Sequence, residues 1–171
     1  SVDAIDDQWR VEDQRPRFKG TVIVKVDLRK DTICVIDNGT GIAEDEWKKF
    51  FRPFATNKMD DLLDAVSSRR GYKGVGATFL SYAFKGVQVS TKNGSSQWSG
   101  KMMGGRDWIE DPDNHQAPEV SEYRETDSDF RDFDRGTLVR IFLGTTQRPK
   151  KASNFGGQGK SVDKERWNMI L

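Results

Sequence analysis

Three short segments stand out for their residue types and their order along the chain. They are Asp37–Gly41 (DNGTG), Gly71–Gly76 (GYKGVG) and Gly136–Thr137 (GT). A buried carboxylate at position 37 could accept a hydrogen bond from the exocyclic amine of adenine, while a bridging water completes recognition of the base. Gly39 and Gly41 would let the backbone approach the base closely, because glycine has no Cβ and accepts positive φ. Taken alone, the first segment is also a typical polar turn.

The second segment has the composition of a phosphate-binding loop. Gly71, Gly74 and Gly76 could allow successive backbone amides to wrap phosphate oxygens, and Lys73 adds a positive charge. The hydrophobic spacing from Ala77 to Phe84 predicts a helix directly afterwards, whose positive end would face the same anion. Such a loop could also close over a nucleotide as a lid. Taken alone, three glycines before a helix could serve packing only.

A predicted hairpin supplies the first part of the scaffold that these segments need. Thr21–Asp27 (TVIVKVD) and Thr32–Asp37 (TICVID) are rich in β-branched residues and are joined by a short connection, a pattern typical of antiparallel strands. Asp37 is therefore expected where a strand ends and the Asn38-Gly39 turn begins. Further strands are predicted at Val87–Thr91 and Thr137–Leu143.

Aromatic residues downstream of Glu44 follow helical spacing. They are Trp47, Phe50, Phe51 and Phe54, at i, i+3, i+4 and i+7. This spacing predicts one buried face of a helix, limited at its far end by Pro53, and the aromatic stripe is expected in the core rather than in a ligand site. A second short helix is predicted around Met59–Val66.

The remaining stretches are expected to lie outside the core. Residues 107–134 contain eleven acidic residues against two basic ones, with little periodicity, which predicts a solvated acidic insertion. Residues 148–160 are expected to form a basic link. Residues 161–171 could form a short terminal helix with Ser161 as its N-cap.

Composition narrows the classes of protein. The 171 residues suit one domain, and 28 basic against 27 acidic residues lack the charge excess usual in nucleic-acid-binding domains. Cys34 and His115 are the only residues of their types, which excludes a disulfide framework and the usual Cys/His zinc site. A Ser-His-Asp triad would need His115, which is expected on the surface. No apolar run approaches the roughly 20 residues that span a bilayer, so a cytoplasmic protein is expected.

Together, the three segments resemble the motifs of the GHKL group of ATPases, which includes Hsp90 chaperones, DNA gyrase B, MutL proteins, MORC proteins and sensor histidine kinases. That group has an Asp-x-Gly-x-Gly motif, a glycine-rich lid and a later Gly-Thr. Phe54–Lys58 is similar to a MutL segment, Gly74–Ala77 to the gyrase lid, and Val87–Lys92 to the following strand in Hsp90. The resemblance covers residues 1–143 and implies the Bergerat fold, an α/β two-layer sandwich with a mixed, largely antiparallel sheet and helices on one face. It assigns residues 1–147 to the ATP-binding domain.

The resemblance implies a role for each matching residue. Asp37 would bind the adenine amine, Gly41 would lie against the base, and Thr137 would help to hold the bridging water. The lid would cradle the phosphates of ATP. The full set of implied ATP-binding residues is Asp37, Gly39, Gly41, Ile42, Asn57, Lys58, Gly71, Lys73, Gly74, Val75, Gly76, Ala77, Thr78 and Thr137.

One departure from the family pattern concerns catalysis. The family's first motif is Glu-x-x-x-Asn-x-x-Asp-Ala, in which Glu activates water and Asn holds Mg²⁺. The chain opens with Ser1-Val2-Asp3-Ala4, which resembles the end of that motif, so both catalytic groups are expected immediately before Ser1. Asp3 and Ala4 would then support the pocket from behind, although Asp3 could equally be an exposed acidic residue. No catalytic or metal-binding residue is assigned within the chain.

Three functions follow from this resemblance. The first is an ATP-driven conformational switch, in which nucleotide closes the lid of a larger and homodimeric protein. The second is a non-hydrolysing nucleotide-binding module that regulates or interacts. The third is a histidine-kinase catalytic domain.

A Walker motif is not predicted. Gly159-Lys160-Ser161 resembles the end of such a motif, but Asn154 occupies the position of its first glycine.

Overall fold

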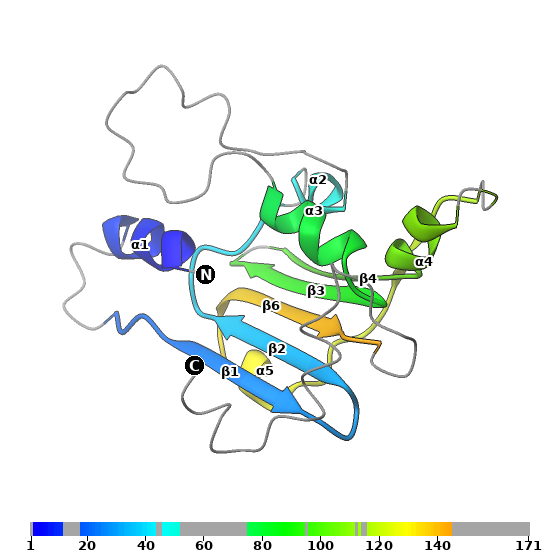
Figure 1. Ribbon diagram of the computed structural model, residues 1–171. Coiled ribbons are helices and arrows are strands. Elements are labelled where there is room, and N and C mark those ends of the chain that lie inside the picture. The colour runs from blue at the N-terminus through cyan, green and yellow to red at the C-terminus, as the bar shows by residue number, and fades with distance from the viewer. Residues whose placement is uncertain are drawn as a thin grey trace.

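The structure, a computed structural model, describes residues 2–11, 18–43, 46–51, 75–94, 96–111, 113 and 116–144 (Figure 1). The strands in these residues are β1 (Val22–Asp27), β2 (Thr32–Asp37), β3 (Gly86–Asn93), β4 (Gln97–Met103), β5 (Val120–Glu122) and β6 (Arg135–Phe142). The helices are α1 (Val2–Val11), α2 (Trp47–Phe50), α3 (Val75–Tyr82), α4 (Gly105–Glu110) and α5 (Ser128–Arg131). Several sequence predictions lie outside the described residues, among them the helix around Met59–Val66, residues 148–171, and His115.

The strands form one open antiparallel sheet in the order β1-β2-β6-β3-β4-β5. Although β6 is the last strand in sequence, it lies between β2 and β3 and joins the hairpin to the rest of the sheet (Figure 1). The architecture belongs to the α+β class. None of the helices in the described part of the chain is long and apolar enough to cross a membrane.

The predicted hairpin is confirmed. Val22 pairs with Asp37 and Asp27 with Thr32, so β1 and β2 lie in register along their whole length. In the connecting turn, the Asp27 carboxylate accepts hydrogen bonds from the backbone amides of Arg29 and Lys30, both at 2.9 Å. Such a side-chain bond to the following backbone is what favours aspartate at turns.

One face of the sheet carries α2 and α3 over an apolar core. Val87, Val89 and Met102 of β3 and β4 pack with Phe51 in a single buried cluster. Phe51 is buried, as expected from the aromatic spacing, and Trp47 stacks on Trp98 with ring centroids 4.0 Å apart. Within the described residues, α2 covers only four positions of the predicted helix. The helix after the glycine segment begins at Val75, two residues earlier than predicted.

The opposite face carries α5 (Figure 1). The prediction that helices lie on one face of the sheet only is therefore wrong. Phe130 of α5 is 1% exposed and packs against Cys34, Ile36 and Leu138 of the sheet. The Asp127 carboxylate caps this helix by accepting from the backbone amides of Asp129 and Phe130.

The expectation of a solvated acidic insertion at residues 107–134 therefore needs correction. The described part of that segment includes most of α4, the strand β5 and the helix α5. Its acidic side chains concealed the anchoring role of Phe130, because a single buried aromatic residue in a polar segment produces no hydrophobic periodicity.

Candidate functional site

Three polar side chains lie in a row across three strands of the sheet. Asp37 of β2 is the register partner of Thr137 of β6, which is in turn the partner of Thr91 of β3. Successive strand residues alternate between faces, so Asp37 lies on the same face as Ile33, which packs in the core near Ala83 and Phe84. The row is therefore on the face that carries α3.

All three side chains of this row are buried. Asp37 is 3% exposed, Thr91 2% and Thr137 9%. Buried polar groups need hydrogen-bond partners, and the Gly39 amide, at 3.0 Å, is among those of the Asp37 carboxylate. The hydroxyl of Thr91 donates to the Gly136 carbonyl at 3.2 Å and accepts from the Ile42 amide at 2.7 Å. Thr91 thus connects the start of β6 with the chain that follows β2.

The turn after β2 is held on its other side by Asn38. Its side-chain oxygen accepts from the Thr21 amide at 2.7 Å, and its side-chain nitrogen donates to the Lys19 carbonyl at 2.8 Å. These bonds connect the turn with the residues that precede β1. They therefore hold one side of the turn that follows Asp37.

Glycine is required in this region by close contacts between backbone segments. Gly41 has φ +75°, and a Cβ there would lie 2.1 Å from the Lys92 carbonyl oxygen. Gly136 has φ +138°, and a Cβ there would lie 1.9 Å from the Asp37 carbonyl oxygen. At Gly39 the nearest atom would be backbone of Ala4, at 2.6 Å. The sequence interpretation assigned Gly39 and Gly41 to approach of a base, whereas these distances give them a role within the protein as well.

The helix α1 packs against the same turn. The Ala4 carbonyl accepts a hydrogen bond from the Thr40 amide at 3.1 Å. Ala4 therefore lies beside the Asp37–Gly41 segment. Asp3 is part of α1, but only its backbone belongs to the described structure.

The predicted lid is described only from its end. Val75, Gly76, Ala77 and Thr78 form the start of α3. Gly76 is exposed, and a Cβ added to it would meet no atom of the described residues within 4 Å. Leu80 of α3 packs against the buried cluster of Phe51, Val87, Val89 and Met102, and so does Ile42 of the Asp37 turn. This shared cluster links α3 to that turn. The other predicted binding residues, Asn57, Lys58, Gly71, Lys73 and Gly74, lie outside the described residues.

Thr91 is the residue of this site that the sequence reasoning missed. The signal was present, because Val87, Val89 and Thr91 occupy alternate positions of a predicted strand and so share one face. A threonine that continues a buried valine row needs a partner for its hydroxyl, but the sequence does not say that Gly136 and Ile42 supply it.

A second polar cluster, which we call the Glu125 network, lies on the opposite face. The Glu125 carboxylate accepts hydrogen bonds from the Tyr123 hydroxyl at 2.7 Å and from Ser90 and Gln88 at 3.1 Å, and pairs with Arg140 at 3.5 Å. Ser90 also contacts the Tyr123 hydroxyl. The network continues through Asp127, which pairs with Arg140 at 3.4 Å and with Lys25 at 2.7 Å.

The charges of the Glu125 network are maintained by its hydrogen bonds. Burial by itself would raise the pKa of Glu125, but the bonds from Tyr123 and from the Asp127 amide, with the nearby Arg140, bring that pKa below its ordinary value. Asp127 behaves in the same way, because Lys25 and two backbone amides outweigh burial and lower its pKa. Burial raises the pKa of Tyr123, so its phenol stays protonated and donates to Glu125.

In the described part of the chain, no three His, Cys, Asp or Glu side chains gather in a way that could hold a metal ion. The comparisons with known proteins do not extend this picture. No protein-family model matches the chain, and a search of curated proteins also finds no match.

Proposed function

We propose that the chain is the adenine-nucleotide-binding domain of a GHKL-type ATPase with the Bergerat fold. The observation that carries this proposal is a buried carboxylate at a strand end. Asp37 is 3% exposed, pairs in register with Thr137 and stands directly before a turn that contains Gly39 and Gly41. A carboxylate in this position can accept a hydrogen bond from the exocyclic amine of adenine.

In this proposal the described residues perform recognition of the base. Asp37 accepts from the exocyclic amine of adenine, and Thr137 on the neighbouring strand holds a water that completes the edge of the base. The backbone from Gly39 to Ile42 forms the wall beside them, since it is held in place by Ala4 and Thr91. The positive end of α3, which begins at Val75, favours the phosphates.

The switch part of the proposal concerns the glycine segment before α3. A loop that wraps phosphate oxygens changes conformation with occupancy, and this change alters the state of a larger, homodimeric protein. Mg²⁺ bound to the phosphates would neutralise charge that develops during phosphoryl transfer. The proposal assigns to the described residues the binding of the nucleotide.

The direct test replaces Asp37 by asparagine. Asn keeps an oxygen for the Gly39 amide and so preserves the turn, but its NH₂ group presents donors toward the amine. We expect the affinity for ATP and for adenosine, measured by calorimetry, to fall by at least about tenfold, the cost of one lost charge-assisted hydrogen bond.

A matched control is Asp132→Asn, which removes an exposed carboxylate on the other face of the sheet. This variant should bind ATP like the unmodified protein. If Asp37→Asn binds ATP with unchanged affinity, Asp37 does not contact adenine and the proposal fails. Hydrolysis is tested separately, by Mg²⁺-dependent phosphate release from a chain extended upstream of Ser1.

A further inference from the structure

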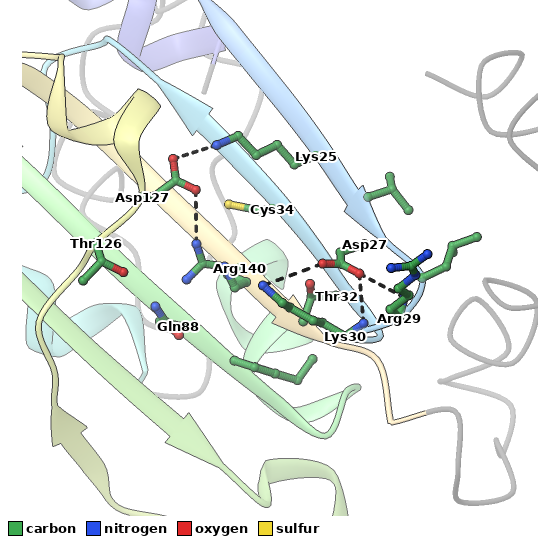
Figure 2. Close-up of a pocket in the computed structure, with 13 residues that line it drawn as sticks. Lys25, Asp27, Arg29, Lys30, Thr32, Cys34, Gln88, Thr126, Asp127 and Arg140 are labelled. Carbon is green, nitrogen blue, oxygen red and sulfur yellow. Dashed lines mark hydrogen bonds and ion pairs between the residues drawn. The ribbon is translucent and has the colours of Figure 1, made fainter.

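A cavity of about 860 Å³ opens on the face of the sheet opposite the Asp37 row (Figure 2). It lies between the turn that joins β1 to β2, the surface of β2, β6 and β3, and the chain at Thr126–Asp127. A cavity of this volume suits a small molecule. The charged groups that define its chemistry are Lys25, Arg29, Lys30 and Arg140 with the carboxylates Asp27 and Asp127.

The carboxylates around this cavity already have several donors each. Asp127 accepts from Lys25, from Arg140 and from two backbone amides. Asp27 accepts from two backbone amides and lies 3.9 Å from the Lys30 ammonium. Behind them, Glu125 has donors on both of its oxygens. The lining therefore has little capacity left for a cationic or donor-rich ligand.

The lining groups that can still form hydrogen bonds with a ligand are cationic side chains and hydroxyls. Arg29 makes no side-chain ion pair within the described part of the chain, and it carries five N–H donors. The only described ion pair of Lys30 is the long one to Asp27, and its side chain is 81% exposed. The two ion pairs of Arg140 are also long, at 3.4 and 3.5 Å, which leaves further donors of its guanidinium. Figure 2 shows Arg29 at one end of the cavity, with the Lys30 side chain extending from there toward Arg140.

The thiol of Cys34, which lines the cavity, is not in its reactive form. Cys34 is 4% exposed, and burial raises the pKa of its thiol to about 11, so it is neutral at physiological pH. Leu28 and Phe142 add apolar surface. This combination suits binding rather than covalent chemistry, because the thiolate is the reactive form of cysteine.

We propose that this cavity binds a small molecule that carries an oxyanion, a phosphate or a carboxylate group, with the anion at Arg29 and Lys30 and the body of the ligand over Leu28 and Phe142. Arg140 supplies donors at the inner end. The site is separate from the proposed nucleotide site, because Cys34 and Asp37 project from opposite faces of β2. It is therefore a place where a second ligand can act on the same sheet.

The experiment uses two probes, inorganic pyrophosphate and citrate, titrated into the protein by calorimetry. We expect at least one to bind with a Kd of about 1 mM or tighter. The double variant Arg29→Gln/Lys30→Gln should weaken that binding by at least about tenfold, since two charge-assisted contacts are lost. Tighter binding of pyrophosphate identifies a phosphate ligand, and tighter binding of citrate identifies a carboxylate ligand.

The matched control is Lys19→Gln/Lys85→Gln, which removes two exposed cations that do not line the cavity. It should leave the affinity for the probe unchanged, and so should Asp37→Asn. Amide NMR shifts at Thr32 and Cys34 on addition of the probe should place the ligand over β2. The proposal is overturned if neither probe binds, if both double variants weaken binding equally, or if Asp37→Asn abolishes it.

Discussion

At the scale of single residues, two side chains of β2 illustrate how position determines chemistry. Asp37 and Cys34 are both buried, on opposite faces of the strand. Asp37 lies at a strand end, where the Gly39 amide donates to its carboxylate and the hydroxyl-bearing Thr137 is its register partner. Cys34 lies beside Ile36, Phe130 and Leu138, where desolvation disfavours the thiolate. The same strand therefore carries a buried carboxylate on one face and a neutral thiol on the other.

The behaviour of Cys34 can be measured with a thiol reagent. Its pKa near 11 lies about two units above the ordinary value, which reduces the thiolate fraction at pH 8 by roughly 100-fold. We expect the native protein to react with Ellman's reagent at least about 100-fold more slowly than the protein unfolded in guanidinium. Equal rates in the two states would show that the thiol is open to solvent and would contradict the described packing.

At the scale of elements, glycines allow backbone segments to approach one another closely around the turn after β2. Gly136, at the start of β6, lies so close to the Asp37 carbonyl that no side chain fits between the strands. Gly76, in the first turn of α3, faces open space within the described part of the chain. The fold therefore requires glycine at position 136, whereas the described contacts leave room for a side chain at position 76.

Alanine substitution tests this difference between the two positions. Gly136→Ala should lower the free energy of unfolding by about 2 kcal/mol or more, because alanine at φ +138° is strained and its Cβ would clash with Asp37. Gly76→Ala should instead raise the free energy of unfolding by about 0.5–1 kcal/mol, since alanine favours the helix. Urea denaturation measures both values.

The same pair of variants also bears on the proposed phosphate contact. If the amides at the start of α3 bind phosphate, Gly76→Ala should weaken ATP binding more than adenosine binding while the protein stays folded. Equal affinities of Gly76→Ala and the unmodified protein for ATP would remove Gly76 from the phosphate site.

At the scale of the whole molecule, the Glu125 network joins distant parts of the chain. Lys25 comes from the first strand, Gln88 and Ser90 from the third, Arg140 from the last, and Glu125 from the acidic segment. These contacts, together with the Phe130 anchor, hold the acidic segment on the sheet. Because the carboxylates are the common acceptors, the stability of this arrangement depends on their ionisation.

The pH dependence of stability follows from the lowered pKa of Glu125 and of Asp127. A carboxyl group whose pKa is lower in the folded state stabilises that state fully above its ordinary pKa, near 4, and loses this contribution as the pH falls through the folded value. We therefore expect the free energy of unfolding to decrease as the pH falls below about 4. Denaturant titrations at a series of pH values measure it.

Glu125→Gln isolates the contribution of one carboxylate to that curve. It should cost about 1–3 kcal/mol at pH 7, since Arg140 and Tyr123 lose a charged partner, and its stability should fall less steeply in acid. Glu122→Gln, at an exposed position of β5, is the control and should follow the unmodified protein. Parallel curves for Glu125→Gln and the unmodified protein would argue against a role for the ionised Glu125.

Local sequence patterns are sufficient to predict the secondary structure around Asp37. Alternating β-branched residues predict the hairpin, and the Asn38-Gly39 turn places Asp37 at the end of its second strand, because strand and turn propensities act over a few neighbouring residues. The helix after the glycine segment was predicted for the same reason. The nucleotide site itself stays a prediction, since the resemblance on which it depends is not tested by the fold.

The contacts between residues that are distant in the sequence are visible only in the folded structure. Thr137 lies beside Asp37 because β6 enters the sheet between β2 and β3, and about 100 residues separate these partners along the chain. Glu125 meets Arg140 for a related reason: Phe130 buries its ring under the sheet and brings the acidic segment with it. Pairing between remote segments depends on the total burial and hydrogen bonding of the folded chain, which no local pattern encodes.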